Sequence, residues 1–288
     1  MRDFDFLEPA SLTEAVRMLS ELGDDCRIFA SGSALLLGMR QRMLSPTSVI
    51  SLGRLGEMRR IDFDPRQGLR IGAMARHAEI AQSPLVRTHY PVLASMASRL
   101  ANPQVRNQGT LGGNLCYADP STDPPGCLLA LGAHAIIQGP DGERTVPFHE
   151  FLVDYFTTAL EPNEILVAIS IPPLAPNAIG LYTRHLRTAA EHRPLANATF
   201  IAQRQGVECT HATLVIGAST VVPTRLARVE DLLLGKRITL DLAEAAGEIA
   251  AQDMEAISDA RGCADLRRTV MRAVVKRTIA QAFSLSWS

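Results

Sequence analysis

The sequence is short of lysine and of long hydrophobic runs, and both shortages exclude classes of protein. No stretch reaches the about 18 consecutive apolar residues that a membrane-spanning helix needs, and Met1 does not open a basic-then-apolar leader. We therefore expect a cytoplasmic protein with no transmembrane segment. Only Lys236 and Lys276 are lysines, and the formal net charge is -1. Because no basic field is available to hold a polyanion, nucleic acid is not an expected partner.

Cysteines are few and scattered. The chain has five of them, an odd number, and none lies two or four residues from another; they are Cys26, Cys116, Cys127, Cys209 and Cys263. Disulfide staples and a locally bound zinc ion or iron–sulfur cluster are both disfavoured by this spacing. We expect any iron–sulfur centre that serves this protein to lie on another chain.

The 288 residues are enough for two domains with buried cores. Three prolines fall within residues 171–177, where they prevent regular structure, so we place the boundary there. The predicted domains are residues 1–175 and 176–288, and the predicted fold class is α+β.

Hydrophobic periodicity and turn residues predict the elements of both domains. The first domain is expected to contain one mixed sheet, helices and a long loop over residues 102–123. Its expected strands cover residues 27–30, 49–52, 58–63, 69–73, 135–138, 144–146 and 165–171, and its expected helices cover residues 11–22, 35–39, 76–82 and 91–101. The second domain is expected to be a three-stranded sheet backed by helices, with strands over residues 182–186, 195–203 and 209–216 and helices over residues 225–234, 240–252 and 266–283.

The most informative stretch is Thr110-Leu111-Gly112-Gly113-Asn114. Glycines have no Cβ, so the backbone can approach a diphosphate closely, adopt positive φ and point consecutive N–H groups at phosphate oxygens. The Asn114 amide can add a donor. A plain Gly-Gly turn without a ligand is the alternative for this stretch.

A second small-residue turn, Ala30-Ser31-Gly32-Ser33-Ala34, stands between a predicted strand and a predicted helix. Free N–H groups at such a junction favour an anion. The spacing is not that of the Rossmann G-x-G-x-x-G fingerprint, and neither turn has the lysine of a P-loop. Two anion-binding turns suit the two phosphates of a dinucleotide better than one, with backbone donors carrying the binding.

Three further stretches point to a family. Residues 4–9 read FDFLEP, residues 71–77 read IGAMARH, and residues 102–114 read NPQVRNQGTLGGN. With these motifs the whole chain resembles the medium, flavin-binding subunit of the carbon monoxide dehydrogenase and xanthine dehydrogenase family. This resemblance implies a two-subdomain FAD-binding domain of the vanillyl-alcohol-oxidase (PCMH) type, followed by a smaller C-terminal domain.

The resemblance also assigns roles to residues. It implies that Ala30 to Ala34 and Thr110 to Asn114 wrap the FAD diphosphate, and that Asp123 reaches the ribityl chain. Capping of the helix that follows Asp123 is the alternative for that residue. Where the family often has an Asp-aromatic pair beside the flavin ring, this chain has His192 and Arg193, so either could face the ring or lie in a solvated loop.

The function implied by the resemblance is electron relay. A large subunit with a molybdopterin cofactor would hydroxylate the substrate, a small subunit would carry 2Fe-2S clusters, and FAD on this chain would collect the electrons for an external acceptor. The expected assembly is a dimer of heterotrimers. Two alternatives remain open: a stand-alone flavoenzyme such as a UDP-N-acetylenolpyruvoylglucosamine reductase, and an assembly subunit without flavin. The second is motivated by Ser31 and Ala34, which replace a glycine and a larger polar residue of the family motif.

Overall fold

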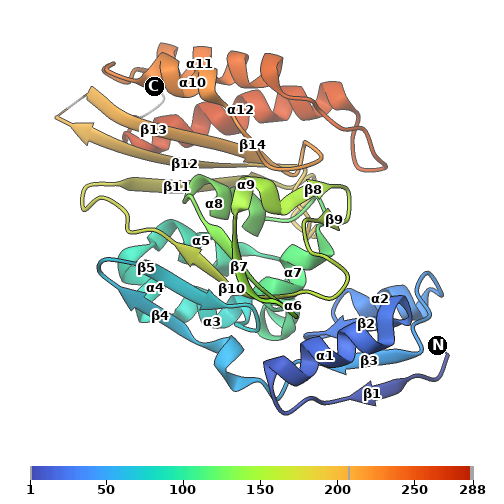
Figure 1. The fold of residues 1–288 in the computed structure, drawn as a ribbon. Helices are drawn as coiled ribbons and strands as arrows, with labels where there is room; N and C mark the ends of the chain where they lie inside the picture. The colour runs from blue at the N-terminus through green and yellow to red at the C-terminus, as the bar shows by residue number, and fades with distance from the viewer. Residues whose placement is uncertain (1, 207, 286–288) are drawn as a thin grey trace.

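A computed structural model describes residues 2–206 and 208–285 of the chain. The fold is α+β, as the sequence predicts. Figure 1 shows a small sheet with the N-terminus at one end of the molecule, a larger sheet with helices in the middle, and a third sheet covered by helices at the other end. Within the described residues, no helix is long and apolar enough to cross a membrane.

The N-terminal sheet has three parallel strands in the order β1-β3-β2. They are β1 (Asp5–Leu7), β2 (Cys26–Phe29) and β3 (Ser48–Ser51). Helix α1 (Leu12–Leu22) connects β1 to β2 and is capped by Ser11, whose Oγ accepts from Glu14 N at 3.1 Å. The Glu14 Oε2 accepts from Ala10 N at 2.7 Å and not from Ser11 N, so the reciprocal bond reaches the residue before the cap. Helix α2 (Leu35–Arg40) follows β2 directly after the small-residue turn.

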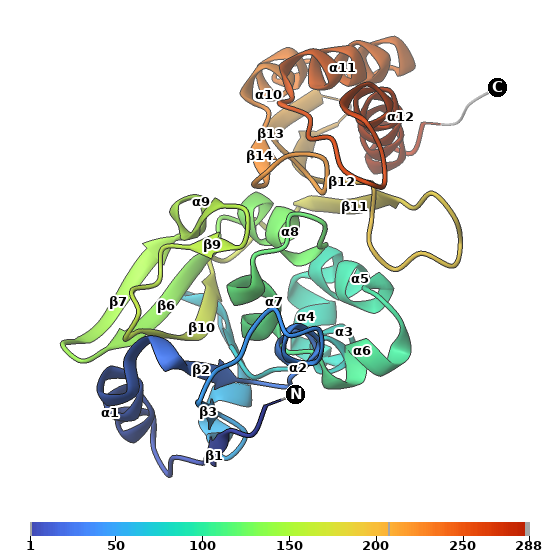
Figure 2. The same ribbon diagram turned by 90° about the vertical axis from the view of Figure 1, so that its right-hand side faces the viewer.

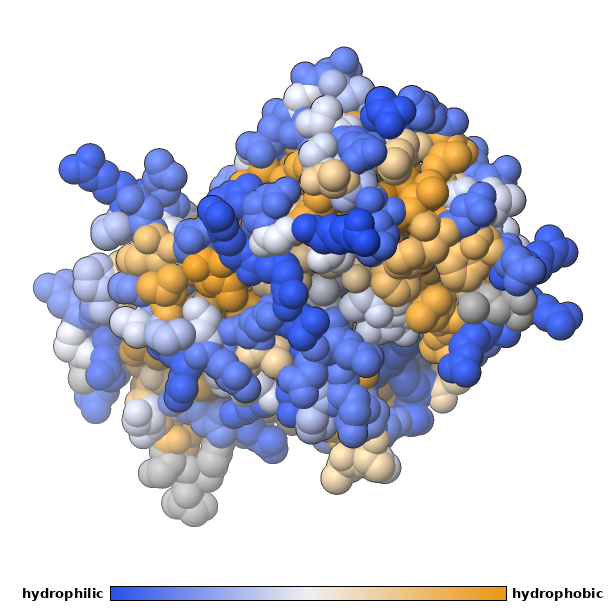
Figure 3. Space-filling model, turned by 90° about the horizontal axis from the view of Figure 1, so that it is seen from below, coloured by the Kyte–Doolittle hydropathy of each residue, from blue (hydrophilic) through white to orange (hydrophobic). Residues whose placement is uncertain are grey.

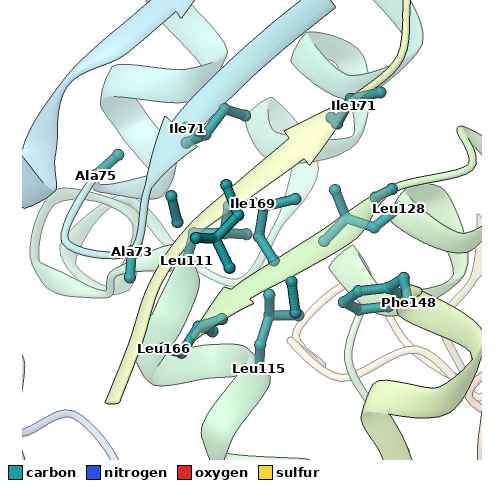
Figure 4. Packing of buried hydrophobic residues seen from close by; sticks show 14 of the residues in the cluster. Ile71, Ala73, Ala75, Leu111, Leu115, Leu128, Phe148, Leu166, Ile169 and Ile171 are labelled. Atoms are coloured by element: carbon teal, nitrogen blue, oxygen red, sulfur yellow. The ribbon is translucent and has the colours of Figure 1, made fainter. Parts of the chain in front are cut away.

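The second sheet is antiparallel and separate from the first, so the expectation of one mixed sheet was wrong. Its order is β4-β5-β10-β6-β7, from β4 (Ile61–Asp64), β5 (Gly68–Gly72), β6 (His134–Gly139), β7 (Gly142–Pro147) and β10 (Ile165–Ile171). The last of these strands in the sequence takes the centre of the sheet, where Ile169 is fully buried. Figure 4 shows Ile71 and Ile169 of this sheet packed with Leu111 and Leu115.

Helices cover this sheet and also occupy the region expected to be a loop. Residues 102–123 contain α6 (Pro103–Gln108) and α7 (Leu111–Tyr117), because Asn102 and Thr110 each cap a helix that the glycines do not interrupt. The remaining elements of this part are α3 (His77–Gln82), α4 (Pro84–His89), α5 (Pro91–Arg99), α8 (Pro124–Ala130), α9 (Phe148–Phe151), β8 (Leu152–Asp154), β9 (Thr157–Thr158) and the 3-10 turns η1 (Gly23–Asp25) and η2 (Gly56–Arg59).

The C-terminal part contains β11 (Ile179–His185), β12 (Ala196–Gln205), β13 (Glu208–Gly217) and a short β14 (Thr224–Arg225), hydrogen-bonded in that order. The three predicted strands are present, and β14 adds a two-residue edge that the sequence did not indicate. Helices α10 (Ala227–Leu233), α11 (Leu240–Asp253) and α12 (Ala264–Ala282) lie on one side of this sheet (Figure 2).

Both faces of the C-terminal sheet are buried. Phe200 and Leu214 pack among the helices α10 to α12, whereas Ile201 and Val215 belong to the hydrophobic core of the first part. Because side chains alternate along a strand, β12 and β13 contribute to two cores at once. Helices α5 and α8 meet this second face. The division at residue 175 stays a prediction, but the two parts share a continuous apolar contact.

Candidate functional site

The first small-residue turn presents free backbone donors. Gly32 has φ of 74°, and a Cβ on it would stand 2.6 Å from Phe29 Cε2, so the turn requires glycine there. Within residues 2–206 and 208–285, no protein oxygen accepts a hydrogen bond from the N–H groups of Ser31, Gly32, Ser33 or Ala34. Four successive donors without a partner among these residues form a cradle that fits phosphate oxygens.

The second stretch is built differently from the expectation. Thr110 caps α7, with its Oγ1 accepting from Gly113 N at 3.1 Å. The N–H of Leu111 donates to Ala75 O at 2.9 Å and that of Gly112 to Ala73 O at 2.7 Å. Neither glycine of the pair has positive φ. The expectation that this stretch uses positive φ and points consecutive N–H groups at phosphate was therefore wrong, because the protein itself takes those donors.

The glycines of the second stretch serve close packing instead. A Cβ on Gly112 would stand 2.6 Å from the Ala73 Cβ, so α7 can lie on the turn after β5 only with glycine at this position. The second motif thus packs on the stretch from Ile71 to His77. In addition, His77 N donates to Gly109 O at 3.1 Å. Burial lowers the pKa of His77 to about 4, so its ring is neutral.

The two stretches meet in space. A Cβ on Gly113 would stand 3.6 Å from the Ala30 Cβ, which places the start of α7 against the end of β2. Next to Gly113, the side-chain oxygen of Asn114 is buried and has no hydrogen-bond partner in the described part of the chain. A buried polar atom without a partner normally signals a missing ligand or water. This oxygen is an acceptor and would take a donor such as a hydroxyl or a water molecule, whereas the free N–H groups of the first stretch and the space beside Gly113 fit a diphosphate held between the two stretches.

Asp123 lies deeper, with 2% of its surface exposed. Its Oδ1 accepts from the Tyr182 hydroxyl and its Oδ2 from Arg184 Nη1, the latter at 3.1 Å. Burial raises the pKa of Asp123 to about 6, against the lowering effect of Arg184 and Tyr182. Asp123 precedes α8 but makes no side-chain hydrogen bond to that helix, so the capping alternative was wrong.

The loop between β11 and β12 contains the two proposed ring-facing residues. His192 is exposed, and within the described residues it makes no hydrogen bond or ion pair. Its neighbour Arg193 has Nη1 2.6 Å from Asp119 Oδ2. The structure therefore brings together the two small-residue stretches, and it links Arg193 to the segment before Asp123, but it leaves His192 apart from them.

Sequence reasoning missed Tyr182, Arg184 and Arg261, which contact the segment Asp119–Asp123 from the C-terminal part. No local signal marks them, because their partners lie between 59 and 140 residues away in the sequence. The cysteines are all free thiols, of which Cys26, Cys127 and Cys209 are buried.

Comparison with known proteins agrees with this geometry. Residues 2–174 match the model of the FAD binding domain in molybdopterin dehydrogenase, and residues 182–282 match that of the CO dehydrogenase flavoprotein C-terminal domain. The carbon monoxide dehydrogenase medium chain of Hydrogenophaga pseudoflava is 33% identical over 98% of this chain and 97% of its own length. The nicotine 6-hydroxylase medium subunit of Paenarthrobacter nicotinovorans is 32% identical over 96% of both chains.

Solved structures show the same likeness. A chain of carbon monoxide dehydrogenase from Hydrogenophaga pseudoflava, in a form that lacks the Mo-pyranopterin moiety of its molybdenum cofactor, superposes with a TM-score of 0.94 at 32% identity, covering 98% of both chains. The fold and these matches define an FAD-binding oxidoreductase subunit. The chain belongs to the family of FAD-binding subunits of molybdopterin-containing dehydrogenases.

Proposed function

We propose that this chain is the electron-relaying subunit of a molybdenum hydroxylase. It would accept electrons from 2Fe-2S clusters on a small subunit and pass them to an external acceptor, while a large molybdopterin subunit hydroxylates the substrate. The single observation that supports this role best is the set of free N–H groups of Ser31 to Ala34, placed beside Gly113 and Asn114. Bound FAD would supply the redox chemistry, and the protein its position and electrostatic surroundings.

The residues divide the work of holding FAD. The N–H groups of Ser31, Gly32, Ser33 and Ala34 would donate to the diphosphate. Ala30 would lie beneath the diphosphate, next to Gly113. Gly113 would leave room for the phosphates, and Asn114 would add its side-chain amide. Thr110, Leu111 and Gly112 hold α7 in place through the contacts described above.

The flavin end of the cofactor would be met by two other residues. We propose Asp123 as the acceptor for a ribityl hydroxyl, since a carboxylate with one donor on each oxygen retains free lone pairs. His192 is proposed to lie over the flavin ring. Its exposed loop is anchored at Arg193 by the ion pair with Asp119, which leaves His192 free to approach the ring.

Partner subunits are proposed from the relatives, whose names describe them as a medium chain and a medium subunit. We propose a large and a small partner, a dimer of heterotrimers, and a cytoplasmic location. Large apolar side chains on the surface favour the proposal that partner subunits dock on this chain. The exposed fractions of Met43, Phe156 and Leu37 are 76%, 55% and 51%. Figure 3 shows apolar surface gathered in separate areas on one face of the molecule.

The alternatives differ in what the purified chain would contain. The four N–H groups of the first turn, which have no partner in the described part of the chain, argue against the flavin-free assembly subunit, because Ser31 and Ala34 leave the backbone donors in place. The test is to purify the chain, denature it and identify any released flavin by chromatography. FAD supports the proposal; FMN contradicts the diphosphate cradle, and a colourless protein that takes up no added FAD favours the assembly subunit.

A further inference from the structure

The segment Asp119–Asp123 belongs to the N-terminal part of the chain, yet side chains from beyond residue 181 hold it. At its start, Arg193 Nη1 lies 2.6 Å from Asp119 Oδ2. The Ser121 hydroxyl accepts a hydrogen bond from Arg261 Nη2. Both arginines stand in loops of the C-terminal part, one between β11 and β12 and one before α12. Two loops that are far apart in the sequence therefore meet on the same segment.

The second half of the segment is held from the strands. Asn197 of β12 donates its Nδ2 to Thr122 O at 3.1 Å. Tyr182 and Arg184 of β11 donate to the two oxygens of Asp123. Four of the five residues of the segment thus have a partner in the C-terminal part.

Burial makes these contacts energetically important. The exposed fractions of Asp119, Ser121 and Asp123 are 4%, 2% and 2%. Buried polar groups cost free energy unless they are hydrogen-bonded, and a buried carboxylate costs more. The segment itself offers only the bond from Ser121 N to Asp119 Oδ1. Its buried conformation consequently depends on the C-terminal side chains.

Arg261 is itself fixed in place. Its guanidinium donates to Asp259 Oδ2, and Asp259 Oδ1 accepts from Arg267 at 2.7 Å. Burial alone would raise the pKa of Asp259, but the hydrogen bonds from Arg261 and Arg267 hold it well below its usual range. Arg267 is fully buried and also donates to Leu195 O and Ala218 O. The Arg261 side chain that contacts Ser121 is therefore held in position by Asp259, which is itself held by the buried Arg267.

We infer that the C-terminal domain positions the Asp119–Asp123 segment for the flavin, with Arg193 and Arg261 as its positioning residues. The inference rests on the proposed function, in which Asp123 meets the ribityl chain. The C-terminal domain then contributes to cofactor binding without touching the diphosphate cradle. Because each arginine also brings a positive charge to the segment, its removal should disfavour the anionic reduced flavin and make the flavin potential more negative.

The test compares Arg193→Met and Arg261→Met with a matched control, Arg268→Met. Arg268 is a C-terminal arginine that pairs with the exposed Asp265, away from the segment. We expect each test variant to bind FAD about tenfold or more weakly than wild type, because Arg261→Met loses a hydrogen bond from a charged group to Ser121 and Arg193→Met loses the ion pair with Asp119. Arg261→Lys, which keeps the charge, should recover part of the affinity. The flavin potential should become more negative in both Met variants and stay unchanged in Arg268→Met.

Hydrogen exchange of the FAD-free chain gives a second measurement that does not depend on the flavin. Residues 119–123 should exchange faster in Arg193→Met and Arg261→Met than in wild type or Arg268→Met. Arg193 is 54% exposed, so its substitution should leave the fold intact. Unchanged exchange and unchanged FAD affinity in both test variants would overturn the inference. If wild type binds no FAD, the proposed function fails, while the exchange measurement still decides whether these arginines hold the segment.

Discussion

Gly113 at the start of α7 faces Ala30 at the end of β2, and a Cβ on Gly113 would stand 3.6 Å from the Ala30 Cβ and 2.8 Å from Thr110 Oγ1. Two small-residue stretches from different parts of the sequence are thereby brought to one place. Among the described residues, one stretch offers N–H groups without a partner, and the other offers space beside Gly113 and the side-chain amide of Asn114, whose buried oxygen has no partner. Their roles are complementary, whereas the sequence suggested two equivalent cradles.

The first prediction concerns the space beside Gly113. Replacing Gly113 with Val should abolish FAD binding, because the branched side chain would fill the gap between Ala30 and Thr110. The fold should remain, since this residue is only partly buried. FAD content after reconstitution and the circular dichroism spectrum measure the two effects. Gly56→Ala is the control, because a Cβ there meets open space; full FAD content in Gly113→Val would show that this position is structural only.

The second prediction concerns the backbone at Gly32. Alanine there should lower the free energy of unfolding by roughly 1–3 kcal/mol, because φ is positive and the methyl group would run into the Phe29 ring. The cradle N–H groups would shift with the turn, so FAD binding should weaken as well. Denaturant titration and FAD titration of the same preparation measure both. A Gly32→Ala chain with unchanged stability and affinity would mean that the turn tolerates another conformation.

The third prediction is a pH dependence from Asp123. Its folded pKa is raised to about 6 from its ordinary 3.8, so the folded chain keeps this proton in a pH window where the unfolded chain has lost it. The contribution of Asp123 to stability is therefore greatest below about pH 4 and decreases as pH rises to 6, by on the order of 3 kcal/mol.

The Asp123→Asn variant has no titratable group at this position, so its comparison with wild type isolates the pH-dependent contribution of Asp123. The free energy of unfolding of wild type relative to the variant should be more favourable at pH 4 than at pH 7, as measured by urea denaturation across that range. A difference that stays constant with pH, or that changes in the opposite direction, would contradict the raised pKa.

The fourth prediction concerns Arg267, which is fully buried and donates to Leu195 O and Ala218 O. Arg267→Met fills similar space but leaves both carbonyl oxygens without this donor and removes a partner of Asp259. We expect a loss of about 2–5 kcal/mol in the free energy of unfolding. Arg272→Met on the same helix, whose partner Glu248 is exposed, should cost less than about 1 kcal/mol. Equal stabilities of the two variants would show that the buried network does not stabilise the fold.

The sequence predicted what local patterns determine. The helix predicted over residues 11–22 is present as α1, and the small-residue stretch Ala30 to Ala34 stands between a strand, β2, and a helix, α2, as predicted. The sequence did not predict features that depend on contacts between residues far apart in the chain. Strand β10 pairs at the centre of an antiparallel sheet, and the partners of Gly112 lie on the turn after β5. Gly112 and Gly113 suggested a loop because isolated glycines destabilise helices. In the fold, the Thr110 cap and close packing on Ala73 outweigh that preference.

The roles of the candidate site residues toward FAD stay predictions, but their surroundings in the fold can be compared with the sequence patterns. The motifs identified the two stretches and Asp123, but the hydrogen bonds that organise Asp123 come from Tyr182 and Arg184 on β11. Such pairs are set by how the C-terminal sheet packs on α8, and no residue pattern along the chain reports that packing.

The most direct test of the central claim is hydroxylase turnover measured with the chain alone and with its molybdopterin and 2Fe-2S partners. Aldehydes, purines and N-heterocycles would be offered with an artificial electron acceptor, and flavin reduction would be followed in the same mixtures. A relay subunit predicts no hydroxylation by the isolated chain, reoxidation of its chemically reduced flavin by the acceptor, and substrate turnover with flavin reduction only in the reconstituted mixture. Substantial turnover by the isolated chain would contradict the relay and identify an independent flavoenzyme.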